Sequence, residues 1–379
     1  MCVSSPSAPT ATKPLYDKTD MGKKVTLRLS DGTEFHGTSF GYEQAVAGEV
    51  VFNTAMMGYP ESLTDPSYAG QLMVLTFPLV GNYGVPPFTI EPNGLATYME
   101  SEKIHASAII VSDYSTDYSH WNAAESLADW LKREHVPGIT GIDTRALTKC
   151  LREHGVMMGQ IIFDDAPEVQ PKAEYEGVNF VAQVSCQQII RYNEGAAKKV
   201  VLVDCGVKQN ILRCLIKRGV EVIRVPWDYD FNTLAFDGLF LANGPGDPDT
   251  CEATVANIRK FLASPEVRPC MGICMGNQLL GKAAGATIYK LKYGHRSHNQ
   301  PVQQVDSTRC FITTQNHGYA VDTTTLSPDW EPYFVNMNDG SNEGIRHKTN
   351  PWFSAQFHPE ACAGPVDTEF LFDDFVQLL

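Results

Sequence analysis

The chain has 379 residues, of which 43% are hydrophobic and 10% aromatic, so it can bury the cores of two or three globular domains. Its formal net charge of −14 argues against nucleic-acid binding, because phosphate recognition needs clustered Lys and Arg. The sequence contains no apolar run of membrane-spanning length and no secretory signal at its start, so we expect no membrane association.

Residues 1–22 are rich in Ser, Thr, Ala and Pro, and we expect them to form a disordered tail. A mitochondrial transit peptide is a weaker alternative, because this stretch lacks Arg and contains Asp17 and Asp20. The ten cysteines follow neither a disulfide framework nor metal-ligand spacing. They favour a reducing compartment, and we expect a cytoplasmic protein.

The N-terminal half carries short elements of mixed type. Residues 24–35 read as two strands joined by a turn at Asp31, which is typical of a hairpin. Apolar residues at helical spacing predict helices over 123–133 and 143–155, and the second begins with a capping Asp and ends on a Gly. These features predict a smaller mixed α/β domain over residues 23–165.

Strands and helices alternate regularly only in the C-terminal half. The polar segment 166–198 has little periodicity and is predicted to be a linker. Repeated βα units then predict an α/β domain over 199–379, with a doubly wound, mostly parallel sheet and helices on both faces. Functional sites in such sheets form at the carboxyl ends of the strands. The expected strands are 200–203, 221–225, 239–242 and 267–273, and the expected helices are 209–217, 252–263, 278–286 and 367–379.

Cys274 lies in the stretch Gly272-Ile-Cys-Met-Gly276, where a predicted strand turns into a predicted helix. Glycines two before and two after a nucleophile leave room for a strained turn, as in the nucleophile elbow of serine hydrolases. A helix N-terminus also favours a thiolate over a thiol. Taken alone, the motif is equally compatible with a buried structural cysteine.

A cysteine nucleophile needs a base, and Gln356-Phe-His-Pro-Glu360 provides one. In extended chain His358 and Glu360 point to the same side, and Pro359 disfavours a helix. A carboxylate on the far nitrogen of the imidazole fixes its tautomer and stabilises the imidazolium. We therefore predict a catalytic group made of Cys274, His358 and Glu360.

A second Gly-rich turn, Asn243-Gly-Pro-Gly-Asp-Pro248, follows the predicted strand 239–242 and should reach the same edge of the sheet. Its backbone N–H groups can stabilise an oxyanion, which is often the largest single catalytic effect. A plain turn is the alternative. A dinucleotide-binding loop fits poorly, because the third glycine is missing.

Cys274 in its elbow, with His358-Pro-Glu360 downstream, resembles the class I glutamine amidotransferases. The resemblance implies that glutamine is hydrolysed to glutamate and ammonia through a cysteine thioester. It also implies a set of glutamine-contacting residues, namely Gly244, Gly246, Met275, Gln278, Asn316, Gly318 and Tyr319.

The N-terminal half resembles the small-subunit family of carbamoyl phosphate synthetases, in Gly48-Glu-Val-Val-Phe-Asn-Thr, Leu63-Thr-Asp-Pro-Ser-Tyr and Gly81-Asn-Tyr-Gly. This resemblance implies that Ser67 joins the glutamine site across a domain interface. It further implies that ammonia passes to a synthetase partner, either a large subunit or a fused domain, in pyrimidine or arginine biosynthesis. ATP, bicarbonate and Mg are expected in that partner, and no cofactor is expected in this chain.

Asn277 is one departure from the family, many of whose members have His at this position, whereas some ammonia-dependent relatives that have lost the nucleophile have Asn. An alternative function is therefore a catalytically weak regulatory or assembly module of an ammonia-dependent synthetase. A free-standing cysteine hydrolase is disfavoured by the large N-terminal domain. His295 and His298 lack further well-spaced ligands, so we expect no metal.

Overall fold

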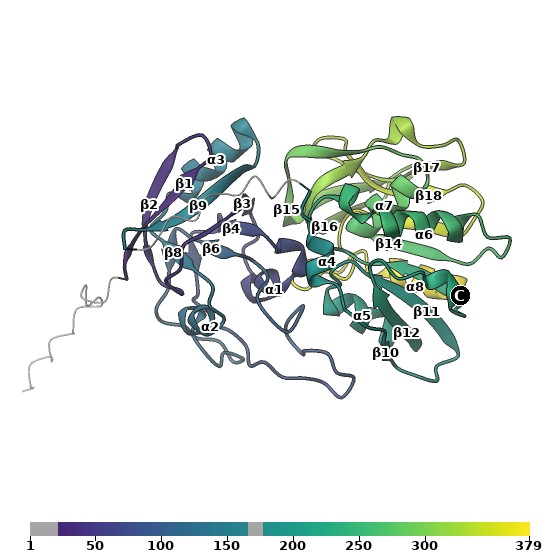
Figure 1. The fold of residues 1–379 in the computed structure, drawn as a ribbon, viewed down its shortest axis with the longest axis horizontal. Helices are drawn as coiled ribbons and strands as arrows, with labels where there is room; N and C mark the ends of the chain where they lie inside the picture. The colour runs from purple at the N-terminus through teal and green to yellow at the C-terminus, as the bar shows by residue number, and fades with distance from the viewer. Residues whose placement is uncertain (1–21, 166–176) are drawn as a thin grey trace, which may run out of the picture.

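The computed structural model describes residues 22–165 and 177–379, which form two units side by side (Figure 1). The tail predicted for residues 1–22 lies outside the described residues except for Gly22, and so does the first part of the predicted linker. Within the two described ranges, no helix combines the length and the apolar character needed to span a bilayer.

The N-terminal unit is built on a closed barrel, which in the described residues has seven strands. In barrel order these are β1 (Lys24–Leu29), β2 (Glu34–Ser39), β8 (Gly138–Thr140), β6 (Ala108–Ile110), β4 (Gln71–Leu75), β3 (Val46–Asn53) and β9 (Met157–Phe163). Its helices are α1 (Tyr59–Thr64), α2 (Leu127–Arg133) and α3 (Thr144–His154), with a 3-10 turn η1 (Pro66–Tyr68) and a small sheet of β5 (Leu79–Val80) and β7 (Asp113–Tyr114).

Alternating side chains along the barrel strands build two apolar clusters. The predicted hairpin is confirmed, because β1 pairs antiparallel with β2. Val50 and Leu72 pack in one cluster together with residues of α3, whereas their neighbours Val51 and Met73 pack in the other with α1 and α2. The period of two therefore buries both faces of β3 and β4.

Helix α2 begins four residues later than the sequence predicts. Ser126 caps it, because its side chain accepts a hydrogen bond from the backbone N–H of Asp129 at 3.0 Å. The preceding residues are extended instead: Ala124 donates its N–H to the carbonyl of Val85, and Glu125 forms a β-bridge with the same residue. The prediction for 143–155 is confirmed, since Asp143 caps α3 and Gly155 ends it with a φ of 94°.

The C-terminal unit is organised around a ten-stranded sheet. Its centre is parallel, from β12 to β19, and its two flanks are antiparallel. In sheet order the strands are β10 (Ile190–Tyr192), β12 (Val220–Pro226), β11 (Lys198–Asp204), β13 (Gly238–Leu241), β14 (Cys270–Ile273), β19 (Trp352–Ala355), β18 (Asn342–His347), β17 (Trp330–Asn336), β15 (Ile288–Gln304) and β16 (Cys310–Val321).

Helices cover both faces of this sheet, as the sequence predicts. They are α4 (Phe180–Val184), α5 (Gln209–Ile216), α6 (Glu252–Leu262), α7 (Met275–Ala283) and α8 (Phe370–Leu378), with 3-10 turns η3 (Phe231–Thr233), η4 (Pro248–Cys251) and η5 (Thr323–Thr325). Val200 and Leu202 of β11 pack in the cluster of α5 and α8, whereas Val201 and Val203 pack in the cluster of α6 and α7. The central strands are thus buried on both sides, which explains their continuous apolar runs.

Part of the segment 166–198, which the sequence analysis took for a linker, is regular structure. Its described residues contain α4, and β10 pairs antiparallel with β12 at one edge of the large sheet. Elements of five and three residues are too short to show a hydrophobic period. In Figure 1, α1 and α4 lie at the boundary between the two units.

Candidate active site

Cys274 lies at the junction of β14 and α7, in the strained conformation that its flanking glycines predicted. Its φ of 53° and ψ of −104° are unusual for a residue with a side chain. A Cβ on Gly276 would lie 2.1 Å from the carbonyl oxygen of Leu241, and one on Gly272 would lie 2.7 Å from the backbone of Gly276. Helix α7 therefore packs directly on the strands, and this contact fixes the elbow.

His358 and Glu360 follow β19 and are almost completely buried. Nδ1 of His358 lies 2.7 Å from Oε1 of Glu360. Burial opposes a charge on this imidazole, but the Glu360 carboxylate and the neighbouring Cys274 side chain raise the pKa of His358 to about 10. The structure thus brings together the three residues predicted to form the catalytic group.

Lys208 was not predicted, and it completes this buried group. Its Nζ lies 3.0 Å from Oε1 of Glu360 and donates to the carbonyl of Ala361 at 2.7 Å. Burial would raise the pKa of Glu360, but Lys208 and His358 lower it to about 2. Lys208 stands between β11 and α5, at the carboxyl edge of the sheet, and this position was its only sequence signal.

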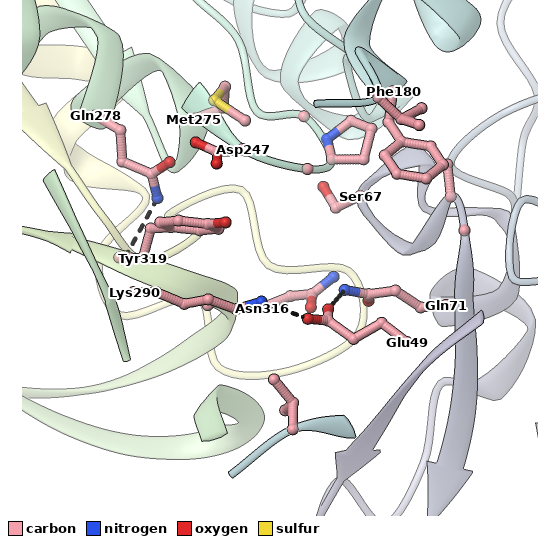
Figure 2. A pocket seen from close by; sticks show the side chains of 18 of the residues that line it. Glu49, Ser67, Gln71, Phe180, Asp247, Met275, Gln278, Lys290, Asn316 and Tyr319 are labelled. Atoms are coloured by element: carbon pink, nitrogen blue, oxygen red, sulfur yellow. Dashed lines mark hydrogen bonds and ion pairs between the residues drawn. The ribbon is translucent and has the colours of Figure 1, made fainter. Parts of the chain in front are cut away.

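A cavity of about 630 Å³ opens beside the elbow, between the two units. Figure 2 shows Gln278, Tyr319 and Lys290 on one side of it and Ser67, Gln71 and Glu49 on the other. All the glutamine-contacting residues implied by the family resemblances line this cavity, namely Ser67, Gly244, Gly246, Met275, Gln278, Asn316, Gly318 and Tyr319.

The N-terminal unit contributes part of the cavity wall, which explains how Ser67 reaches the site. Its Oγ accepts a hydrogen bond from Nδ2 of Asn243 at 2.9 Å, and Oδ1 of Asn243 accepts from the backbone N–H of Lys208 at 3.0 Å. Asp65 accepts from Nδ2 of Asn316 at 3.2 Å. Buried hydrogen bonds therefore join the barrel to the catalytic edge of the sheet.

Charged residues that sequence reasoning missed also line the cavity. Nζ of Lys290 lies 2.8 Å from Oε1 of Glu49, and Nε2 of Gln71 donates to Oε2 of the same carboxylate at 3.0 Å. Burial would raise the pKa of Glu49, but Lys290 and Arg296 lower it, so this carboxylate is ionised at neutral pH. The cavity wall therefore carries both signs of charge, which suits a zwitterionic ligand.

Two family models match this chain. The model of class I glutamine amidotransferases matches residues 201–378, and the model of the small-chain domain of carbamoyl phosphate synthase matches residues 27–161. The arginine-specific small chain of carbamoyl phosphate synthase from Saccharomyces cerevisiae is 51% identical over 364 residues, which cover 93% of this chain and 88% of the yeast protein. The chain belongs to the carbamoyl phosphate synthase small chain family.

Longer relatives contain the same unit. The mitochondrial carbamoyl-phosphate synthase [ammonia] of Homo sapiens is 48% identical over 93% of this chain, which spans 23% of the human protein. The multifunctional protein pyr1-3 of Dictyostelium discoideum is 50% identical over 94% of this chain, which spans only 17% of that protein. The region matched by this chain thus makes up most of some relatives and only a small part of others.

Asn277, the departure from the family pattern, points away from the cavity. Its side chain is fully buried, donates to Oε1 of Gln356 at 2.8 Å and accepts from Oγ of Ser354 at 2.7 Å. It is not among the residues that line the cavity. The side chain of Asn277 therefore ties α7 to β19.

We expect Asn277→Ala to lower the free energy of unfolding by about 1–3 kcal/mol, because Gln356 and Ser354 lose a buried partner. The rate at which a glutamine-analogue chloroketone labels Cys274 should not change. Urea denaturation measures the first quantity and timed mass spectrometry the second. Slower labelling without a loss of stability would contradict this structural assignment.

The pair of His358 and Glu360 predicts a definite pH window for stability. The pKa of His358 rises from 6.5 to about 10, so its contribution is fully present below pH 6.5 and is lost as the pH rises through 10. The pKa of Glu360 falls from 4.5 to about 2, so its contribution is present above pH 4.5 and is lost as the pH falls through 2.

We therefore expect the difference in unfolding free energy between wild type and His358→Gln to be greatest between pH 4.5 and 6.5 and to shrink toward pH 10. Urea titrations of both proteins across this range measure it. A difference that stays constant up to pH 10 would show that the imidazolium is not held by Glu360.

Proposed function

We propose that this chain hydrolyses glutamine and passes the ammonia to a carbamoyl phosphate synthetase partner. The observation that carries the proposal is that His358, held by Glu360, lies beside Cys274, whose neighbour Met275 lines the cavity between the two units. An imidazolium next to a cysteine stabilises the negative charge of a thiolate, which is the reactive form of the nucleophile.

In the first half of the reaction, Sγ of Cys274 attacks the side-chain carbonyl carbon of glutamine. The C–N bond then breaks, His358 gives its proton to the leaving nitrogen, and ammonia departs from a γ-glutamyl thioester. Water next attacks the thioester while His358 removes a proton from it. The C–S bond breaks, glutamate leaves, and Cys274 and His358 return to their starting state.

Backbone donors at two turns would stabilise the oxyanion formed in both halves. The N–H of Met275 lies in the first turn of α7, directly after the nucleophile. Gly244 is pressed against the end of β11, since a Cβ there would lie 2.0 Å from the carbonyl oxygen of Cys205. Donors on such a rigid backbone need no reorganisation as charge develops on the substrate.

The charges of the cavity support an amino acid as the ligand. Lys290 and Arg296 are available to a carboxylate, and Glu49 and Asp247 to an ammonium group. Binding would then compete with the Glu49–Lys290 ion pair. The side-chain amide of the ligand would point toward Cys274, along the wall formed by Met275 and Gln278.

We expect Cys274→Ala to lower glutamate release by about a thousandfold or more, because the nucleophile acts as part of a unit. Glutamine binding should survive, and chloroketone labelling should be lost. Cys150→Ala, which removes a partly exposed thiol outside the cavity, is the matched control and should retain both. Near-normal glutamate release by Cys274→Ala would overturn the proposal. Absence of labelling in the wild type would favour the catalytically weak module instead.

The partner would bind ATP, bicarbonate and Mg, and it would be either a separate large chain or a synthetase segment of the same polypeptide. Both arrangements of the partner are supported by the relatives, because the chain spans most of the yeast small chain but only a small part of the much longer pyr1-3. We place the reaction in a reducing compartment, the cytoplasm, because Cys274 must stay reduced.

We further propose an exit for ammonia past His358, through a cavity that shares Asn316 with the glutamine cavity. A small polar cavity of about 20 Å³ there is lined by His358, Lys208, Asp65 and Glu61. Glu61 also lines an outer pocket of about 300 Å³, which lies beside the exposed side chain of Met57. Ammonia that left this way would not pass the bound glutamate and would stay out of bulk water, where it becomes ammonium.

We expect Glu61→Trp to close this exit. In the complex with the synthetase, carbamoyl phosphate formation from glutamine should fall by about tenfold or more relative to formation from added ammonia, while glutamate release continues. Glu153→Trp, at an exposed position on α3, is the matched control and should change neither ratio. An equal fall of both carbamoyl phosphate rates, or no fall, would refute the route.

A further inference from the structure

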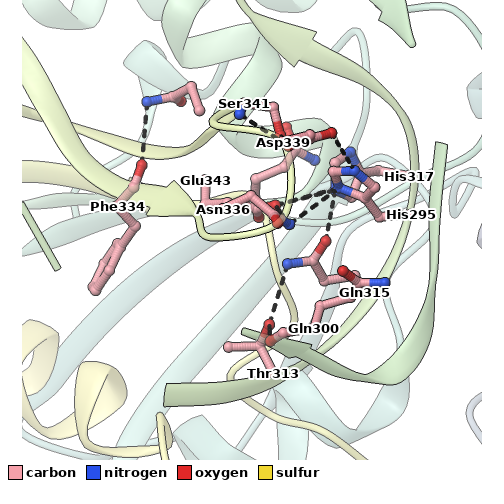
Figure 3. Close-up of polar contacts among 12 residues, drawn as sticks. His295, Gln300, Thr313, Gln315, His317, Phe334, Asn336, Asp339, Ser341 and Glu343 are labelled. Carbon is pink, nitrogen blue, oxygen red and sulfur yellow. Dashed lines mark hydrogen bonds and ion pairs between the residues drawn. The ribbon is translucent and has the colours of Figure 1, made fainter. Parts of the chain in front are cut away.

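Behind the cavity, three strands bring two histidines and a glutamate together (Figure 3). They are His295 of β15, His317 of β16 and Glu343 of β18, and all three are buried. One ligand-type atom from each lies within 4.8 Å of the others. The sequence analysis considered His295 with His298 and expected no metal, but His298 lies elsewhere, against the proposed ammonia exit.

The outer nitrogen of each histidine is held by a group that can only accept a hydrogen bond. Nε2 of His295 lies 2.9 Å from a carboxylate oxygen of Asp339, and Nδ1 of His317 lies 2.8 Å from the carbonyl oxygen of Tyr319. In a neutral imidazole the hydrogen is then on the outer nitrogen and the lone pair on the inner one. Both inner lone pairs face Glu343, whose Oε1 is 3.4 Å from Nδ1 of His295 and 3.8 Å from Nε2 of His317.

Gln315 adds a fourth acceptor. Its Oε1 lies 3.1 Å from Nε2 of His317. The orientation of the amide is fixed, because its Nε2 donates to Oγ1 of Thr313, whose hydroxyl already donates to the carbonyl of Gln300. Two nitrogen lone pairs and two oxygens therefore converge.

One neutral donor, Nδ2 of Asn336, reaches into this group. It lies 2.8 Å from Oε1 of Glu343 and 3.4 Å from Nδ1 of His295. The second carboxylate oxygen of Glu343 is buried and has no hydrogen-bond partner among the described residues. Converging acceptors with so few donors make a site that favours a positive charge.

We propose that this cluster binds one divalent cation, with Zn²⁺ as the best match, through Nδ1 of His295, Nε2 of His317, Oε1 of Glu343 and Oε1 of Gln315. Zinc with ligands at about 2.0–2.1 Å in a tetrahedron keeps those ligands about 3.4 Å apart. Three of the six separations between these atoms, at 3.1, 3.4 and 3.8 Å, lie around that value, and the atoms of His295, His317 and Glu343 are all within 4.8 Å of one another.

The surroundings fit a structural metal. Ligating histidines almost always donate their other N–H to a carboxylate or a carbonyl, as His295 does to Asp339 and His317 to Tyr319. Four protein ligands in a buried cluster leave no open position for water, which distinguishes a structural site from a catalytic one. The two imidazole nitrogens favour zinc over calcium or magnesium, which prefer a shell of oxygen ligands.

The site would act on the glutamine cavity through β16. Gln315 and His317 alternate along this strand with Asn316 and Gly318, which line the cavity. A cation that fixes one face of the strand also fixes the other. This consequence rests on the proposed function: loss of the metal should raise KM for glutamine more than it lowers kcat, because Asn316 and Gly318 line the cavity, whereas Cys274, His358 and Glu360 are not ligands of the metal.

The first test uses the purified chain and needs no activity. After dialysis against zinc and gel filtration, we expect about one zinc ion per chain by mass spectrometry, and a thermal midpoint that falls when a strong chelator removes it. Cobalt in place of zinc should give the visible absorption of a tetrahedral site, without the charge-transfer band of a cysteine ligand. No retained metal, or a cobalt spectrum with thiolate bands, would overturn the proposal.

Variants decide which residues hold the ion. Glu343→Gln, which keeps the shape of the side chain, and His295→Gln should each weaken zinc binding by about tenfold or more. His154→Gln, at an exposed position on α3, is the control and should bind as the wild type does. Equal binding by all variants would refute the site, as would a stability that responds to pH but not to zinc. Labelling of Cys274 by the chloroketone reports separately on the proposed glutaminase.

Discussion

The arrangement of this protein depends on one buried line of charges, from Lys208 through Glu360 to His358. A carboxylate removed from water is costly unless a cation and hydrogen bonds compensate it. Glu360 receives both, because Lys208 lies 3.0 Å away and His358 2.7 Å away on the same oxygen. Lys208 and His358 are far apart in the sequence of the domain. Their contacts with Glu360 therefore join the end of β11 to the segment after β19, and they hold the imidazole next to Cys274.

A second constraint is that neither unit encloses the cavity alone. The sheet domain supplies Cys274, the turn at Gly244 and the strand that carries Tyr319, whereas the barrel supplies Glu49 and Ser67. Polar contacts between the units, such as that of Ser67 with Asn243, place barrel residues within reach of the same ligand. The barrel therefore has a role in the site as well as any role in holding a partner.

Local patterns allowed the sequence to predict the elbow and the regular βα units well. Cys274, His358 and Glu360 each lie in a short motif whose residue types follow from the chemistry. The central strands have continuous apolar runs, which are typical of a sheet that is buried on both faces. The helix at 123–133 was predicted too long, because Ala124 and Glu125 pair with Val85, which a helical period does not reveal.

What the sequence could not predict is contact between distant segments. The roles of Lys208, Glu49 and the cluster of His295, His317 and Glu343 do not follow from their own sequence motifs, because these residues meet their partners only when separate parts of the chain come together. The barrel was missed for the same reason. Its strands are short, and the parallel pairings of β4 with β3 and β6 join segments that follow one another only through long connections.

A cavity with walls from two units makes its own ligand a cross-link between them. Bound glutamine would touch the barrel and the sheet at once, and any ligand that binds the joined form stabilises that form by mass action. The stability of the interface between the two units would then increase with the concentration of free glutamine. A partner that binds both units would then meet a more rigid surface when glutamine is abundant, and this change would precede the release of ammonia.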